Sequence, residues 1–166
     1  HFSGYWKDVG TISSLWEANM EVLDPKNSGI DLFDEDWKIY SRNSGMTGHK
    51  IGSDAVIKNS MITDGCRIDG EVEHSVLFAG VKVAPGAVVK DAVVMGGTVI
   101  KPGAVVEHCI IGENAVIGEN AKIGVEKEGE DKGVATIGPG VYVGDGATVG
   151  SNAMVRENVK DGEEEW

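Results

Sequence analysis

The sequence predicts a mainly β protein: a parallel β-helix of hexapeptide repeats, preceded by one helix and a linker. Three observations lead to this fold class. An aliphatic residue recurs every six positions over much of residues 49–160, and a small residue stands two positions before each next aliphatic. Glycine is also abundant, at 24 of 166 residues. A six-residue spacing matches neither a 3.6- nor a 3.5-residue helical period, and it is typical of a parallel β-helix.

Residues 12–23, "ISSLWEANMEVL", are predicted to form the helix. Thr11 is the expected N-cap, and Ser14 with Glu17 is an alternative capping box if the helix begins later. Pro25 should end the helix, because the residue before a proline is pushed away from helical angles. Apolar side chains recur at helical spacing on one predicted face: Ile12, Leu15, Trp16, Met20 and Leu23.

Residues 25–48 show no sustained period and are expected to be a linker. The stretch "DLFDEDWKIYSRN" mixes aromatic and charged residues, as a segment does when it is pinned across a surface, and "SGMTG" is expected to be a flexible joint. The aromatic residues Phe33, Trp37 and Tyr40 should need cover from another domain or a neighbouring subunit.

The repeats begin at residue 49 with three copies of one pattern, "IGSDAVIKNSMI", "VAPGAVVKDAVV" and "IKPGAVVEHCII". Each hexad should supply a short strand with its aliphatic side chain inward and a tight turn of Gly, Asn or Asp. Ile111, Ile117 and Ile123 are therefore expected inward on three successive faces of one coil. Three hexads close a triangular coil of about 18 residues, which gives roughly six coils, and residues 125–136 should loop out from a corner.

Charge and composition exclude several classes of function. With 15 basic and 27 acidic residues the formal net charge is −12, which argues against nucleic acid and anionic membranes as partners. The acidic segments 125–133 and 161–166 are expected to be solvated. No apolar run is long enough to cross a bilayer. Cys66 and Cys109 have neither metal-site nor disulfide spacing and are expected to be small buried hydrophobic residues in a reducing cytosol.

Hexapeptide prisms resemble the left-handed β-helix family, which includes acyltransferases and the C-terminal domains of some sugar-nucleotide pyrophosphorylases. Three stretches narrow the resemblance: "GYWKDVGTISSLWEANMEVL", "DEDWKIYSRN" and "EHSVLFAGVKV". In this order they closely resemble bacterial glucose-1-phosphate adenylyltransferases, the ADP-glucose pyrophosphorylases of glycogen synthesis. The likeness runs from residue 2 to about residue 124, and only generic hexads follow.

The resemblance implies a C-terminal fragment of a longer enzyme, consistent with a chain that does not begin with Met. Residues 1–24 would be the edge of an α/β nucleotidyltransferase domain, 25–48 a linker, 49–160 a left-handed β-helix domain and 161–166 an acidic tail. The parent would form ADP-glucose and pyrophosphate from ATP and glucose-1-phosphate with Mg²⁺, in the cytoplasm. The fragment lacks the family's glycine-rich nucleotide loop and is expected to be inactive alone. Its expected role is that of an assembly or regulatory domain. The parent is expected to form a homo-oligomer, a tetramer, or a complex with a sister subunit.

Site residues also follow from the resemblance. Asp8 matches the aspartate that helps to hold Mg²⁺ and binds substrate, although its spacing equally suits a turn-closing role. Trp6 matches a residue beside the sugar-phosphate pocket, with a core aromatic as the alternative, and Tyr5 is expected in the core. Lys82 and Arg42 are candidate contacts for an anionic allosteric effector, with plain surface cations as the alternative. Many relatives carry an arginine near Gly80 that this chain lacks, which puts activation by fructose 1,6-bisphosphate in doubt.

An alternative function is a hexapeptide acyltransferase that uses acyl-CoA. Such enzymes use a histidine as general base, and His74 and His108 are the candidates. Both follow an acidic residue at hexad positions that face outward. A solvated or hydrogen-bonded role is therefore favoured for both histidines.

Overall fold

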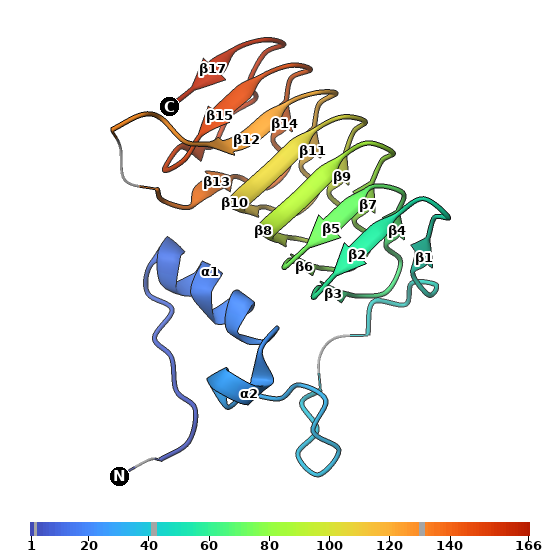
Figure 1. Cartoon of the computed structure of the whole chain (residues 1–166), viewed down its shortest axis with the longest axis vertical. Helices are drawn as coiled ribbons and strands as arrows, with labels where there is room; N and C mark the ends of the chain where they lie inside the picture. Colours follow the sequence, from blue (N-terminus) through green and yellow to red (C-terminus); the bar gives the residue numbers. More distant parts are fainter. Residues whose placement is uncertain (2, 41–42, 130–131) are drawn as a thin grey trace.

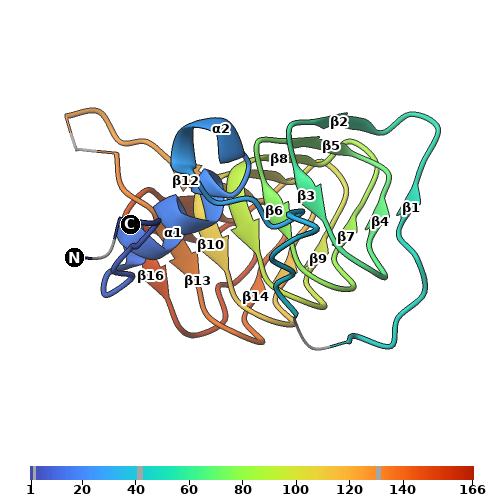
Figure 2. The ribbon, with the colours of Figure 1, turned by 90° about the horizontal axis from the view of Figure 1, so that it is seen from below.

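The computed structural model describes residues 1, 3–40, 43–129 and 132–166. It confirms the predicted fold class: a parallel β-solenoid of about seven turns with two short helices on one side (Figures 1 and 2). The strands stack rung above rung along the solenoid, so each pairs only with the equivalent strands of neighbouring turns. No helix in the described part of the chain is long and apolar enough to cross a membrane.

The strands form three faces, and every pairing between them is parallel. Face A contains β1 (Lys50–Ile51), β4 (Arg67–Ile68), β7 (Lys82–Val83), β9 (Val99–Ile100), β11 (Val116–Ile117) and β14 (Tyr142–Val143). Face B contains β2 (Val56–Lys58), β5 (Glu71–Glu73), the first halves of β8 (Val88–Val94) and β10 (Val105–Ile111), β12 (Lys122–Val125), β15 (Thr148–Gly150) and β17 (Glu164–Glu165). Face C contains β3 (Met61–Ile62), β6 (Val76–Leu77), the second halves of β8 and β10, β13 (Ala135–Ile137) and β16 (Met154–Val155).

The core is the inward column of aliphatic side chains. Ile111, Ile117 and Ile123 lie on faces C, A and B in succession and are each at most 1% exposed, as the hexad register predicts. The turns are slightly shorter than the expected 18 residues. Lys50 pairs with Arg67 and Lys82 with Val99, 17 residues apart, whereas Arg67 pairs with Lys82 after 15. Because the corners vary in length while the strands stay in register, the chain fits about seven turns rather than six.

Both acidic segments are expected to be solvated, and their described residues are mostly exposed, but the tail also forms an unforeseen strand. Within 161–166, β17 pairs with β15 and adds a rung to face B, while the two glutamate side chains of β17 stay exposed. As predicted for the 125–136 segment, residues 126–129 and 132–134 leave the solenoid between β12 on face B and β13 on face C (Figure 1). Lys132 pairs with Glu126 at 2.6 Å within this segment, and Val134 is buried.

The helical part is α1 (Ile12–Glu21) followed by α2 (Pro25–Ser28). Thr11 is the N-cap, as predicted. The alternative start with Ser14 and Glu17 is wrong, because Ser14 itself completes the capping box: its N–H donates to Thr11 Oγ1 and its Oγ accepts from the Thr11 N–H. Glu17 is thereby left free for an ion pair with Lys7.

Helix α1 packs on the outside of face C. The predicted apolar face of the helix, including the buried Met20, meets an outward row of aliphatic side chains from successive rungs: Met61, Val76, Val93 and Ile110. Face C is therefore apolar on both sides, since the neighbours of these residues point into the solenoid core. This second core fixes α1, and with it the residues just before α1, against the β-helix.

A column of residues at the corner between faces B and C also holds α1. His74, Asp91 and His108 occupy equivalent positions on successive rungs, all with positive φ (44°, 47° and 44°). His74 Nδ1 lies 2.6 Å from Asp91 Oδ1. The Trp16 indole N–H donates to the Asp91 carbonyl at 2.7 Å, and its ring lies 4.3 Å from that of His108. We call these three residues the corner column.

We expect Ile117→Asp to unfold the β-helix, because an unpaired carboxylate would be buried in the core at a cost of several kcal/mol. Ile117→Val should cost only about 0.5–1.5 kcal/mol, since it removes one methylene. Chemical denaturation of the three proteins checks this. An Asp variant as stable as the unchanged chain would show that the inward register is wrong.

The docking of α1 should weaken in acid. Burial against Trp16 lowers the pKa of His108, helped by the charge of Lys132 and opposed by Asp91 and Glu126. The docked helix therefore favours the neutral imidazole. The stabilisation that docking gains from neutral His108 is complete above the ordinary histidine pKa of about 6.5. It is lost as the pH falls through the lowered pKa of His108.

Hydrogen exchange of α1 amides, corrected for intrinsic pH dependence, should show faster opening at pH 5 than at pH 7.5. His108→Asn is the control, because asparagine tolerates positive φ but does not titrate there. The control leaves the His74–Asp91 pair in place. An equal acid effect in that variant would assign the pH dependence to another group.

Candidate functional site

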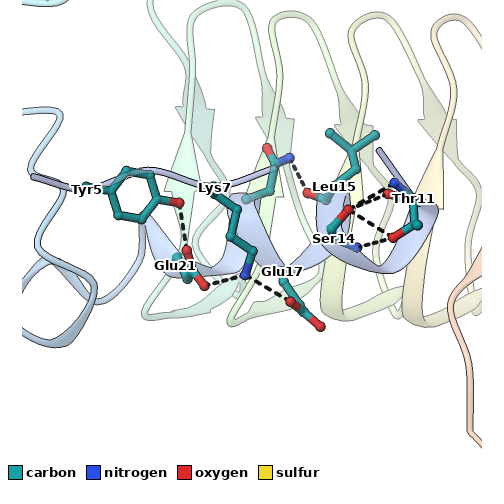
Figure 3. A network of polar contacts seen from close by, with 8 residues as sticks. Tyr5, Lys7, Thr11, Ser14, Leu15, Glu17 and Glu21 are labelled. Atoms are coloured by element: carbon teal, nitrogen blue, oxygen red, sulfur yellow. Dashed lines mark hydrogen bonds and ion pairs between the residues drawn. The ribbon is translucent and has the colours of Figure 1, made fainter. Parts of the chain in front are cut away.

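The segment before α1 runs back along the helix and is tied to it by charged side chains (Figure 3). Lys7 Nζ lies 2.9 Å from Glu17 Oε2 and 2.6 Å from Glu21 Oε1. The Tyr5 hydroxyl donates to Glu21 Oε2 at 2.6 Å. We call these four residues the α1 network. Tyr5 is thus half-buried and hydrogen-bonded at the rim of the helix, not in the core as predicted.

The electrostatics of the α1 network are mutually reinforcing. Lys7 and the Tyr5 hydroxyl hold the pKa of Glu21 below its usual value. The Glu21 carboxylate in turn raises the pKa of Tyr5 and, with Glu17, that of Lys7. The shifts favour a charged Lys7, a charged Glu21 and a neutral Tyr5 phenol near neutral pH, so the segment stays tied to α1.

Trp6 and Asp8 alternate with the two tethered residues. Tyr5 and Lys7 are half-buried by their contacts with α1, whereas Trp6 is 76% exposed and Asp8 is also exposed. Trp6 borders an open cavity of about 380 Å³, which is also lined by Tyr5, Lys7, Glu21, Asp24, Asn27 and Ser28. Trp6 therefore has no core role in this chain.

Asp8 is placed at the turn that leads into α1. Its Oδ1 accepts from the Gly10 N–H at 3.0 Å, immediately before the N-cap residue Thr11. The turn-closing role is thus present. Oδ2 has no hydrogen bond among the described residues, and no group of three metal-ligating side chains occurs there. Mg²⁺ commonly takes one or two carboxylates and completes its shell with substrate oxygens and water, so a single free carboxylate oxygen fits a shared ion and not a closed protein site.

Lys82 lies on a different face from Asp8 and Trp6. It points outward from β7 on face A, directly between Arg67 of β4 and Val99 of β9, and Lys50 follows on the rung beyond Arg67. We call Lys50, Arg67 and Lys82 the cation column. Arg42, the second predicted effector contact, lies outside the described residues. The cation column could have been predicted from the sequence, because each of its cations stands immediately before an inward aliphatic residue.

The two histidines considered as acyl-transfer bases are both engaged in the corner column. His74 is bound to Asp91, and His108 is stacked against Trp16 with a lowered pKa. The spacing of His74, Asp91 and His108 by 17 residues, one turn of the solenoid, was a signal that the sequence reasoning missed. The favoured solvated or hydrogen-bonded role agrees with the geometry of His74, whereas His108 is packed against Trp16.

The two cysteines are buried and free, as predicted. Burial raises the pKa of both thiols, and the Cys66 Sγ also donates to the Phe78 carbonyl at 3.2 Å. A protonated, inaccessible thiol is a poor nucleophile and metal ligand. Both residues therefore act as small hydrophobic core residues.

Comparison with known sequences identifies relatives with named activities. The chain is 56% identical over 94 residues to the glucose-1-phosphate adenylyltransferase of Clostridium perfringens strain SM101, a match that covers 57% of this chain and 24% of that protein. The enzyme of the same name from Geobacillus stearothermophilus is 53% identical over 89 residues, covering 54% and 23%. The predicted resemblance is confirmed, and the matched region spans about a quarter of the length of these relatives.

Comparison with solved structures finds the acetyltransferase domain of PglB from Neisseria gonorrhoeae FA1090. In its complex with acetyl coenzyme A this domain has a TM-score of 0.47 and 20% identity, over 70% of this chain and 50% of that one. The same domain without that complex gives a TM-score of 0.45 and 26% identity. The family model described as GlmU-like, C-terminal hexapeptide matches residues 44–143, more than half of the chain. With its stacked hexads and this match, the chain belongs to the GlmU-like C-terminal hexapeptide family.

Proposed function

We propose that this chain is the C-terminal part of an enzyme that forms ADP-glucose and pyrophosphate from ATP and glucose-1-phosphate, for glycogen synthesis in the cytoplasm. The observation that carries the proposal is the 50–56% identity, over about 90 residues, to proteins named glucose-1-phosphate adenylyltransferase. Identity at this level over about 90 residues is far more specific than a hexad pattern alone. The segment before α1 supports the same function, because it carries Trp6 and Asp8 and the α1 network ties it to the helix.

Asp8 is the residue that we propose for the chemistry. Bound Mg²⁺ would neutralise the phosphate charges that must approach one another in nucleotidyl transfer. Asp8 would contribute its free carboxylate oxygen, while the Gly10 N–H orients the other oxygen. The α1 network holds the backbone on which Asp8 stands, and Trp6 would lie beside the sugar phosphate, which the neighbouring open cavity allows.

The β-helix domain would serve assembly and regulation. Its described residues hold no cluster of metal-ligating groups. His74 is hydrogen-bonded to Asp91, His108 packs against Trp16, and both cysteines are buried. Four exposed apolar side chains between residues 33 and 40 need cover, which supports a homo-oligomer or a complex with a sister subunit. Lys82 would provide an outward cation for an anionic group.

We expect the purified 166-residue chain to release no pyrophosphate from ATP, glucose-1-phosphate and Mg²⁺, because its sequence contains no glycine-rich phosphate loop. A coupled pyrophosphate assay measures this. Turnover well above a no-protein control would contradict it. Titration of the same sample with acetyl-CoA separates the alternative function, for which saturable binding would be required.

In the longer enzyme, Asp8→Asn should lower kcat by on the order of 10²-fold or more, since a metal-holding charge is lost where phosphate charge develops. The amide oxygen can still close the turn with Gly10, so helix stability should be kept. Asp54→Asn, at an exposed corner of the first coil, is the matched control and should leave kcat unchanged. An Asp8→Asn enzyme with normal kcat would leave Asp8 only its turn-closing role.

A further inference from the structure

Face A is the open side of the solenoid. Face C is covered by α1, and face B carries ion pairs that join successive rungs, Lys58 with Glu71 and Glu73, and Lys90 with Glu73. Face A has no covering helix among the described residues, and its ion pair between Lys101 and Asp145, with Lys101 over the Tyr142 ring, lies at its edge toward face B. Its outward side chains begin with the cation column and continue with a half-buried apolar row of Val99, Val116 and Tyr142.

The cation column is electrostatically unsatisfied. Lys50, Arg67 and Lys82 are all exposed and stand directly opposite one another on adjacent rungs, about 4.8 Å apart by the usual strand spacing. None of them has an ion pair within the described part of the chain; the nearby carboxylates, Asp64 and Asp69, stand at the corners beside the face. Like charges directly opposite one another destabilise a sheet, so an anionic partner would relieve a real repulsion.

Residues 31–40, "DLFDEDWKIY", have the complementary chemistry. We call this segment the arm. It carries four carboxylates against one lysine, and its Phe33, Trp37, Ile39 and Tyr40 are 77%, 78%, 59% and 88% exposed. Two aspartates shape it: Asp31 Oδ1 accepts from the Phe33 N–H, and Asp34 Oδ1 accepts from the N–H groups of Asp36 and Trp37. These bonds hold the arm in turns that leave its aromatic rings outward.

The two ends of the arm are anchored to the same chain, the first beside α1 and the second at the edge of face A. Helix α2, just before the arm, lies beside α1 (Figure 2). Just after the arm, Ser44 donates to Asp64, and Met46 covers Gly65 and Gly80 at the corner between faces C and A. The arm is thus presented outward at one end of the solenoid, where it can reach a neighbouring molecule.

We propose that the arm of one copy of this chain docks on face A of a second copy, and the reverse. The carboxylates of the arm would meet the cation column, and its aromatic rings would cover Val99, Val116 and Tyr142. The exchange is self-complementary, so it closes as a two-fold dimer in which both arms and both open faces are covered. This inference rests on the proposed assembly role and names the surfaces that carry it. It also explains how a chain of net charge −12 associates, because the contact pairs its acidic arm with an unneutralised basic strip.

Two charge reversals test the proposal. Glu35→Lys with Asp36→Lys reverses the arm and spares the turn-closing Asp31 and Asp34 side chains. Arg67→Glu with Lys82→Glu reverses the face at exposed positions. Lys122→Glu with Lys160→Glu is the control for the face variant: it makes the same charge change at exposed positions outside the cation column.

Sedimentation should show the unchanged chain and the control as dimers at micromolar concentration. Each reversed variant alone should dissociate about 10²-fold more readily, because a like-charged arm and face then meet in both halves of the dimer. An equimolar mixture of the two reversed variants should restore the dimer, since each arm then finds an oppositely charged face. Docking within one chain cannot give that rescue.

Each contrary result would overturn a different part of the proposal. A monomeric unchanged chain would refute both the assembly role and the docking. A dimer that survives both reversals would keep the assembly role and overturn the docking surfaces, and so would a mixture that stays monomeric. If Arg67 and Lys82 instead bind inorganic phosphate or fructose 1,6-bisphosphate in a monomeric chain, the column is a small-anion site and the proposal is wrong.

Discussion

No strand in the described part of the chain can satisfy its backbone within its own turn of the solenoid. Each is two to seven residues long and finds its hydrogen-bond partners only in the turns before and after it. The corners must therefore repeat at the same height on every turn, which requires sharp turns. Positive φ is accepted there by glycine and otherwise only by asparagine, aspartate and histidine among the described residues. The rest of the architecture depends on this register, including the corner column that holds α1.

The same register gives each of the three faces a different set of outward side chains. A side chain that faces outward at one rung lies directly above its equivalent on the next, so each face acquires a uniform character. Face C became an aliphatic row that receives α1, face B a series of alternating charges, and face A a column of cations followed by an apolar row. The candidate active-site segment is positioned by only one of them, through α1. The solenoid thus supports Asp8 from a distance, without contributing a group beside it.

The sequence predicted the inside of the molecule much better than its outside. Ile111, Ile117 and Ile123 were correctly placed because inward positions are the only ones that obey the six-residue period. Which face α1 covers depends on outward residues such as Val93 and Ile110, which the period does not constrain. The strand in the acidic tail was missed because two glutamates give no apolar signal, yet the rung above β15 needs only backbone groups. At the candidate site, Asp8 was identified through the family resemblance. The α1 network was not predicted, because it joins residues 10 to 16 positions apart across a reversal of the chain that no local pattern reveals.

Helix α1 has a mechanical consequence for the solenoid it covers. It touches Met61, Val76, Val93 and Ile110, which belong to four successive turns, while β16 and β17 at the far end lie beyond this group. A force along the long axis would peel the last turns one by one, since each is held only by its neighbour. The first four turns would have to slide together against one helix before any of them could separate. The molecule is therefore stiff over the turns that α1 spans and compliant beyond them. The N-terminal end of α1 points toward the later turns (Figure 3), so Asp8 stands near the boundary between the stiff and the compliant part, and strain in the last turns would reach it through that end of the helix.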